Sequence, residues 1–236
     1  MNISKIKIIF FDFGGTIDSN GVDWGIKLYN LFKESKITIK KEDVISAYEK
    51  TMNMLYADNK SASLSYKETV DVYIYWTLKN LGLTIENYKK SIFEPFYYSA
   101  LETINYNKKI LKKLAEKYTL GIISNNFGNC KNWCVELGIK DYFKVIIDST
   151  KAGVKKPDKK IFSLAVQEIR CLPENAVYVG DKYEIDIISA KASGLNPIWI
   201  KNDEEKIKNP AEVIAITKLK ELLNIFQIKD EIKLLL

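Results

Sequence analysis

The stretch FFDFGGTID at residues 10–18 decides how this chain folds, because an apolar run ends there in an aspartate, Asp12, and two glycines follow. The apolar run starts at residue 6 and has the length of a strand. A charged residue that ends a buried run is costly unless it has a partner. Asp12 therefore either caps a loop or belongs to a functional site, and the rest of the sequence favours the second interpretation.

Further runs of the same kind follow, and helical patterns lie between them. The expected strands cover residues 6–11, 119–124, 144–147, 176–179 and 197–200. The expected helices cover residues 108–117, 130–137, 160–169, 184–193 and 218–226, and Pro157-Asp158 is a start signal for the third. Strands that alternate with helices of this length predict βαβ units. The fold class is therefore α/β, with a doubly wound parallel sheet.

Residues 20–105, between the first and second expected strands, have a different pattern. Helical periodicity covers residues 24–33, 41–56, 65–81 and 85–92, and no convincing strand interrupts it. We therefore expect two domains, a core formed by residues 1–19 and 106–236 and a helical insertion formed by residues 20–105.

The composition excludes several classes of protein. The 236 residues carry a formal charge of +6 and contain no histidine. Any general acid or base must then be a carboxylate, Lys, Tyr or Cys, and a Ser-His-Asp arrangement is excluded. Arg170 is the only arginine, whereas nucleic-acid sites favour arginine for bidentate contacts. We expect a surface covered with lysine and no nucleic-acid partner.

Membrane and secretion signals are also missing from the sequence. No run approaches the roughly 18 apolar residues of a membrane span, and the start has no small-residue cleavage site. Three cysteines, an odd number, are typical of reduced thiols. We expect a cytoplasmic protein with no membrane partner, as a monomer or homodimer.

Polar side chains follow the expected strands, at the edge where open α/β sheets bind ligands. These residues are Asp12, Ser124, Asn125, Asn126, Lys156, Asp181 and Asp186. Each alone has an ordinary explanation, such as a turn hydroxyl or a solvated lysine. Together they supply carboxylate oxygens for Mg²⁺, a carboxylate nucleophile and a cation for phosphate.

In their order and spacing these residues resemble the haloacid dehalogenase superfamily of hydrolases, in the branch with a cap inserted after the first motif. The four matching segments are FFDFGGTID, GIISNN at residues 121–126, VKKPDKKIF at 154–162 and YVGDKYEIDIISAKASGL at 178–195. The resemblance implies a Rossmann-like core, a helical cap over residues 20–105, and a Mg²⁺-dependent phosphatase for a small phosphorylated substrate.

The resemblance also implies roles for single residues. Asp12 is the implied nucleophile, and Mg²⁺ binds to Asp12, the Gly14 carbonyl, Asp181 and Asp186. The implied substrate-binding residues are Ser124, the amide of Asn125, Lys156 and Thr16, where Thr16 supports the loop. Asp12, Ser124 and Lys156 form the implied catalytic set.

Gly14 departs from the pattern of the superfamily. Most of its phosphatases have a second aspartate there, which protonates the leaving group and then activates water. Residue 14 still offers its backbone carbonyl as a metal ligand, but the carboxyl group that would act as acid and base is missing. Such general acid-base catalysis contributes about 10²- to 10⁴-fold in rate.

Four interpretations of the function follow. The first is a phosphatase in which Asp18, Glu184, a cap residue or a metal-bound water takes the proton, or whose substrate has a good leaving group. The second is a phosphate- and metal-binding protein without turnover. The third is a dehalogenase and the fourth a phosphonatase, although relatives of these two kinds have Tyr or Ala at the position of Gly14.

The cap is rich in aromatic residues and has two candidate hinges. Tyr66, Tyr73 and Trp76 recur at helical spacing. We expect them, like Tyr97 and Tyr98, to be core residues, with a substrate-stacking surface as the alternative. The candidate hinges are residues 20–21 and 93–100.

Overall fold

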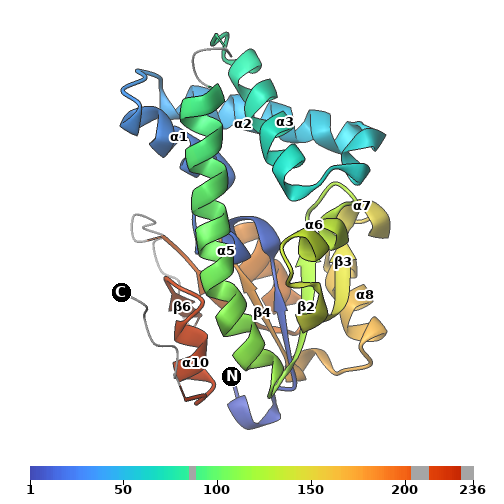
Figure 1. The fold of residues 1–236 in the computed structure, drawn as a ribbon. Helices are drawn as coiled ribbons and strands as arrows, with labels where there is room; N and C mark the ends of the chain where they lie inside the picture. The colour runs from blue at the N-terminus through green and yellow to red at the C-terminus, as the bar shows by residue number, and fades with distance from the viewer. Residues whose placement is uncertain (85–88, 203–212, 230–236) are drawn as a thin grey trace.

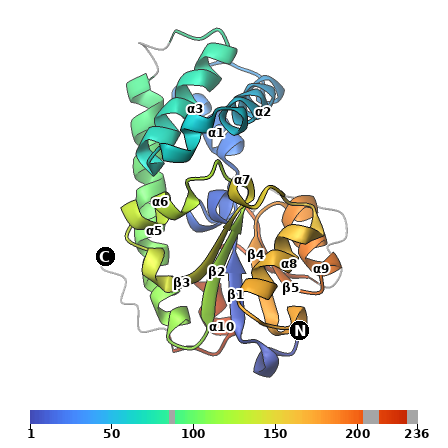
Figure 2. The ribbon, with the colours of Figure 1, turned by 90° about the vertical axis from the view of Figure 1, so that its right-hand side faces the viewer.

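The computed structural model describes residues 1–84, 89–202 and 213–229. Its centre is a parallel sheet with helices on both faces (Figure 1, Figure 2). Within the described residues the strands are β1 (Ile8–Phe11), β2 (Thr119–Ser124), β3 (Phe143–Asp148), β4 (Ala176–Gly180), β5 (Asn196–Ile200) and β6 (Ile214–Ile216). Their order is β3-β2-β1-β4-β5-β6, and all neighbours are parallel. The predicted doubly wound sheet is confirmed, and the edge strand β6 was not predicted.

Strand β1 is apolar at every position because both faces of the sheet are covered. Successive side chains of a strand point to opposite faces. Ile9 and Phe11 pack in one core cluster, which includes residues of α5 (Glu94–Ala115) and α10 (Glu221–Ile225). Phe10 packs in a second cluster with α8 (Lys159–Glu168) and α9 (Ser189–Ala192).

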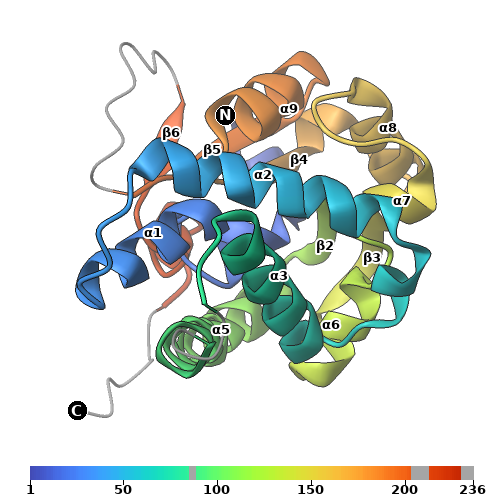
Figure 3. The same cartoon turned by 90° about the horizontal axis from the view of Figure 1, so that it is seen from above.

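Long α-helices make up most of the described chain between β1 and β2. They are α1 (Trp24–Glu34), α2 (Lys41–Ala57), α3 (Tyr66–Asn80) and α5. Figure 1 shows α1, α2 and α3 as a layer above the sheet, and α5 runs from this layer down beside the sheet. Seen from above, α2 crosses over the sheet (Figure 3). The start of α3 is fixed by a capping box between Ser65 and Glu68.

The expected end of this insertion and most of one of its candidate hinges fall within α5. The boundary drawn between residues 105 and 106 lies inside this continuous helix, and so does most of the candidate hinge at 93–100. Of the helix expected over residues 85–92, residues 85–88 lie outside the described part of the chain.

The remaining helices follow the second half of the sheet. They include α6 (Cys130–Glu136) and the short α7 (Ser149–Ala152). Asp158 caps α8 by accepting a hydrogen bond from the N–H of Lys160 at 2.9 Å, as the start signal predicted. The helix expected over residues 184–193 is a wide helical turn, Tyr183–Ile188, followed by α9. None of the helices described here combines the length and apolar character that a membrane crossing requires.

Candidate active site

Asp12 lies directly after β1, at the edge where the parallel strands end. Its backbone N–H donates to the carbonyl of Val179 in β4 at 2.9 Å. The register pairs Phe11 with both Ile122 and Val179. This pairing brings Ser124, at the end of β2, and Asp181, after β4, to the same edge as Asp12.

The turn after Asp12 needs a glycine at position 15. Gly15 has φ +84°, a conformation that L side chains rarely adopt. A Cβ there would lie 2.1 Å from Oδ2 of Asp181. The hydroxyl of Thr16 donates to Oδ1 of Asp181 at 3.4 Å. The turn therefore packs against Asp181.

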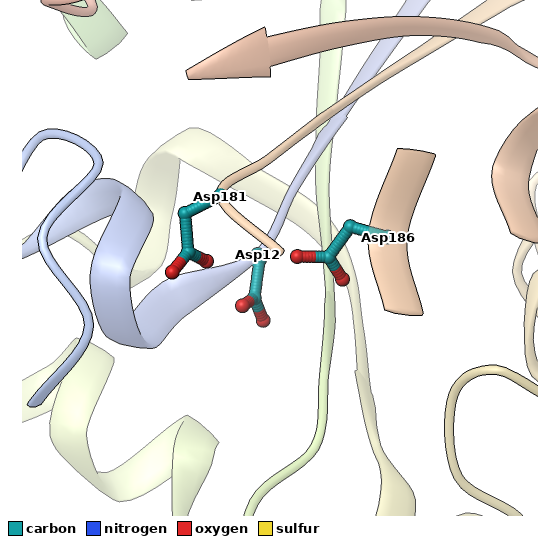
Figure 4. A group of neighbouring side chains, drawn as sticks. All are labelled: Asp12, Asp181 and Asp186. Carbon is teal, nitrogen blue, oxygen red and sulfur yellow. The ribbon is translucent and has the colours of Figure 1, made fainter. Parts of the chain in front are cut away.

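Asp12, Asp181 and Asp186 form a buried cluster of carboxylates. Figure 4 shows their side chains side by side, and one ligand oxygen from each lies within 4.8 Å of the others. Burial raises the pKa of Asp181 well above its usual value, and the charges of Asp186 and Asp12 raise it further. Burial also raises the pKa of Asp12, which Lys156 partly offsets. Buried carboxylates this close fit a divalent cation with a preference for oxygen ligands, such as Mg²⁺.

Lys156 is the cation of the cluster. Its Nζ lies 2.9 Å from Oδ1 of Asp12 and 2.7 Å from Oδ1 of Asp186. Burial alone would lower the pKa of Lys156, but the charges of these two carboxylates outweigh burial and raise it. Lys156 therefore holds its proton while it pairs with both carboxylates.

Two neighbours fix the position of Lys156. The Asn125 side chain donates to the Lys156 carbonyl at 3.0 Å and accepts from the Lys156 N–H at 2.8 Å. The ammonium of Lys156 donates to the Tyr178 hydroxyl at 2.7 Å, and that hydroxyl lies 3.0 Å from the Ile123 carbonyl, to which it can donate. Sequence reasoning missed Tyr178, because a tyrosine inside an apolar strand looks like a core residue.

Asp18 was one candidate for the missing acid and base, but the structure gives it another task. It is fully buried and accepts four hydrogen bonds from the described residues. The N–H of Gly15 and the Ser19 hydroxyl bond to Oδ1, at 2.9 and 2.7 Å. Trp24 Nε1 and the Tyr66 hydroxyl bond to Oδ2, at 2.7 and 3.1 Å. Asp18 thereby ties the turn after β1 to α1 and α3.

The other named candidate, Glu184, does not line the cavity beside Asp12. It is exposed on the wide turn after β4.

A cavity of about 440 Å³ opens from Asp12 toward the helical layer. Its floor includes Ser124, Asn125, Lys156 and Asp186, and Gly14 lies at its side. The wall opposite Asp12 is one face of α2, and it carries the residues Tyr48, Glu49, Met52, Asn53 and Tyr56.

The expected cap aromatics lie elsewhere. Tyr66 and Tyr73 are fully buried in the core cluster and do not line this cavity, as the core interpretation predicted. Trp76 and Tyr97 are half-buried, and the core interpretation is wrong for Tyr98, which is 60% exposed. The aromatic residues that do line it are Trp24, Tyr48, Tyr56, Phe127 and Trp133.

The sequence also matches known proteins. A model of the family described as haloacid dehalogenase-like hydrolase matches residues 9–200. A glyceraldehyde 3-phosphate phosphatase of Methanothermobacter thermautotrophicus is 30% identical over 152 residues, which are 60% of this chain and 64% of that protein. One of Pyrococcus furiosus is 34% identical over 128 residues, 51% of this chain and 52% of that protein. The matches thus span between half and two thirds of these relatives.

A solved structure shares the fold. The HAD-hydrolase YfnB from Bacillus subtilis, bound to magnesium, is 19% identical and superposes with a TM-score of 0.55, over 94% of this chain and 99% of that chain. At this identity the likeness concerns the fold alone.

Proposed function

The chain belongs to the haloacid dehalogenase-like hydrolase family, and from this premise we propose that it is a Mg²⁺-dependent phosphatase that acts through an aspartyl-phosphate at Asp12. The observation that carries the proposal is the position of Asp12 at the floor of a cavity, where it is held by Lys156 at 2.9 Å and clustered with Asp181 and Asp186. The names of the phosphatases that match the chain support a small phosphorylated metabolite as substrate.

The chain's own residues would divide the work as follows. A carboxylate oxygen of Asp12 attacks phosphorus, and the bond from phosphorus to the leaving oxygen breaks. The Ser124 hydroxyl and the Asn125 amide bind phosphoryl oxygens, and Lys156 neutralises charge between Asp12 and the phosphoryl group. Water then attacks phosphorus and releases phosphate and the Asp12 carboxylate.

Mg²⁺ would be held by Asp12, Asp181, Asp186 and the Gly14 carbonyl. When bound, it would supply the positive charge that offsets the charge on the transferred phosphoryl group. Thr16 would support this site through its hydrogen bond to Asp181. Residues 1–19 and 106–236 would form the catalytic core, and residues 20–105 the cap that closes the leaving-group side.

One observation favours a second function. Gly14 offers no side chain for acid-base chemistry, which supports a protein that binds phosphate and metal without turnover. The buried carboxylate cluster argues against a metal-independent dehalogenase.

Phosphate release from acetyl phosphate and p-nitrophenyl phosphate tests the proposal. We expect turnover that requires Mg²⁺ and falls at least 10³-fold in Asp12→Asn, in the range seen when a nucleophile is removed. Asp141→Asn, at a residue outside the cavity, is the matched control and should retain the rate. Undiminished activity in Asp12→Asn would overturn the proposal, and stoichiometric phosphate binding without turnover would favour the second function.

A further inference from the structure

The space beside Gly14 is occupied by an indole ring. A Cβ built on Gly14 would lie 3.7 Å from Nε1 of Trp24, which is an ordinary van der Waals contact. The indole is packed in turn, stacked on Trp133 with ring centres 6.0 Å apart. The group nearest to a Cβ at residue 14 is therefore an indole N–H, which is no proton donor of useful acidity.

Behind the indole lies Asp18, which is fully buried. The Trp24 N–H is already donated to Asp18, and Asp18 receives four hydrogen bonds as a buried acceptor. Asp18 therefore positions the turn and Trp24, and it does not line the cavity in which a substrate would bind.

A second carboxylate that accepts several hydrogen bonds lies on the leaving-group side of the cavity. In an in-line displacement by Asp12 the leaving group points away from Asp12, toward α2 and the start of α1. Asp23 there accepts from Lys182 Nζ at 3.0 Å, from the Tyr48 hydroxyl at 3.2 Å and from the Gly25 N–H at 2.8 Å. It is both an ion-pair partner and the cap of α1.

The other possible proton donors that line the cavity among the described residues are two tyrosines, a glutamate and the lysines Lys155 and Lys182. Burial lowers the pKa of Lys182, but the charges of Tyr48, Asp23 and Asp181 outweigh burial and raise it, so that its ammonium is a weak acid.

Burial raises the pKa of Tyr48, and the charge of Asp23 raises it further. Burial raises the pKa of Tyr56 to about 12. Acids this weak donate poorly near neutral pH. Glu49, exposed on α2, is the carboxyl group that still has to be tested.

We infer that this site is built for phosphoryl donors whose leaving group departs as an anion: acyl phosphates, phosphoanhydrides and phosphate esters of acidic hydroxyls. The inference rests on the proposed function and narrows its substrate class. Alkyl phosphates, glyceraldehyde 3-phosphate among them, are poor substrates, because an alkoxide cannot leave without a proton.

The chemistry balances without a protein acid. The new bond joins an Asp12 oxygen to phosphorus, and the electron pair of the breaking bond stays on the leaving oxygen, as a carboxylate, phosphate or phenolate. In the second step the water oxygen joins phosphorus, and its proton passes to a phosphate oxygen or to solvent. Asp12 recovers its electron pair as a free carboxylate.

The test is a series of aryl phosphates of similar shape, 4-nitrophenyl, phenyl and 4-methoxyphenyl phosphate, with acetyl phosphate and glyceraldehyde 3-phosphate alongside. The quantity to compare is kcat/KM, because it reports the steps up to departure of the leaving group and is independent of how fast phosphorylated Asp12 is hydrolysed. We expect kcat/KM to fall at least about 10²-fold from 4-nitrophenyl to phenyl phosphate, the least that a missing acid should cost.

A kcat/KM that stays within threefold across the aryl series, with Mg²⁺-dependent turnover of acetyl phosphate intact, would overturn the inference and leave the proposed function standing. Absence of turnover with every compound of the series, acetyl phosphate included, would overturn both.

Variants of Glu49 and Asp23, the two carboxylates on the leaving-group side, test whether either one acts as the acid. In Glu49→Gln and Asp23→Asn we expect the ratio of kcat/KM for 4-nitrophenyl phosphate to that for phenyl phosphate to stay within threefold of the native ratio. Lys50→Gln, at an exposed neighbour of Glu49 outside the cavity, is the matched control. A rise of tenfold or more in either variant would identify that residue as the acid and overturn the inference.

Discussion

The turn after β1 leaves no room for a side chain at residue 15. Gly15→Ala combines a left-handed backbone with a Cβ placed 2.1 Å from Asp181. The backbone conformation alone costs about 1–2 kcal/mol, and forced overpacking typically adds about 1–3 kcal/mol. We predict a lower free energy of unfolding, by chemical denaturation, and weaker Mg²⁺ binding because Asp181 is displaced.

Gly153→Ala is the matched control for this prediction. Gly153 has φ +66° and no atom within 4 Å of an added Cβ, so it carries the backbone cost alone. Equal losses of stability in the two variants would contradict the close approach between Gly15 and Asp181.

Lys27 should give the protein a pH-dependent stability. Burial lowers the pKa of Lys27 to about 8, from a usual 10.5, while the charge of Asp18 acts in the opposite direction. Below pH 8 the buried charge of Lys27 lowers the free energy of unfolding by its full amount. This loss is relieved as pH rises to 10.5, because the unfolded chain keeps a proton that the folded protein has lost.

We therefore predict that Lys27→Met raises the free energy of unfolding at pH 7, and that the gain shrinks between pH 8 and 10.5. Urea titrations across this range measure it, with Lys33→Met at an exposed position of α1 as the control. A gain that is constant with pH would contradict the lowered pKa.

At the residue scale, the sequence predicts side chains that follow strands and misses those that reach the site from elsewhere. Asp12, Ser124 and Asp181 were identified because each comes where an apolar run ends. Tyr178 could not be identified in this way, because its hydroxyl contacts the site through Lys156, which lies 22 positions away in the chain. Trp24 was predicted as part of a helix and not as the ring that lies beside Gly14.

Helix α5 links the helical layer to the sheet through a buried asparagine. Asn107 is fully buried, and its Nδ2 donates to the Ile17 carbonyl at 2.9 Å and to Asn20 Oδ1 at 3.1 Å. Removing the donor leaves a buried carbonyl without this partner, which costs about 1–3 kcal/mol.

We predict that Asn107→Ala lowers the free energy of unfolding by about that amount. Asn105→Ala, at an exposed position of the same helix, should be neutral or slightly stabilising because alanine is the better helix former. Equal effects of the two substitutions, in denaturant titrations, would show that the Asn107 bonds contribute nothing.

Asn107 also explains why the start of α5 was predicted wrongly. The apolar stripe of α5 runs through Phe96, Ala100 and Ile104 and resumes at Ile110. Asn107 interrupts it, so the pattern predicted a helix only from residue 108 and a hinge near its true start. Strand β6 was missed because its residues, Ile214–Ile216, are too few to show a period.

On the scale of the whole molecule, the helical layer is joined to the core on two sides of the cavity. On one side Asn129 donates to the Leu64 carbonyl at 2.9 Å, and both Asn129 and Trp133 donate to the Thr69 hydroxyl, at 3.1 and 3.3 Å. On the other side lies the Asp23–Lys182 ion pair, which is partly exposed. The two attachments keep α2 over Asp12.

Periodicity predicted the parallel sheet and the presence of a helical insertion, because both depend on local patterns. The position of α2 over the site could not be predicted in this way. It depends on contacts between α3 and α6, whose residues are about 60 positions apart in the chain.

The central claim, that Asp12 is the nucleophile, is tested most directly by trapping the phosphorylated protein. Protein mixed with acetyl phosphate and Mg²⁺ is quenched in acid, and the tryptic peptide of residues 8–27 is analysed by mass spectrometry. We predict one phosphoryl group on Asp12, released by hydroxylamine as an acyl phosphate, and none in Asp12→Asn. Continued hydrolysis in Asp12→Asn, or a phosphoryl group on another residue of the native protein, would contradict the account.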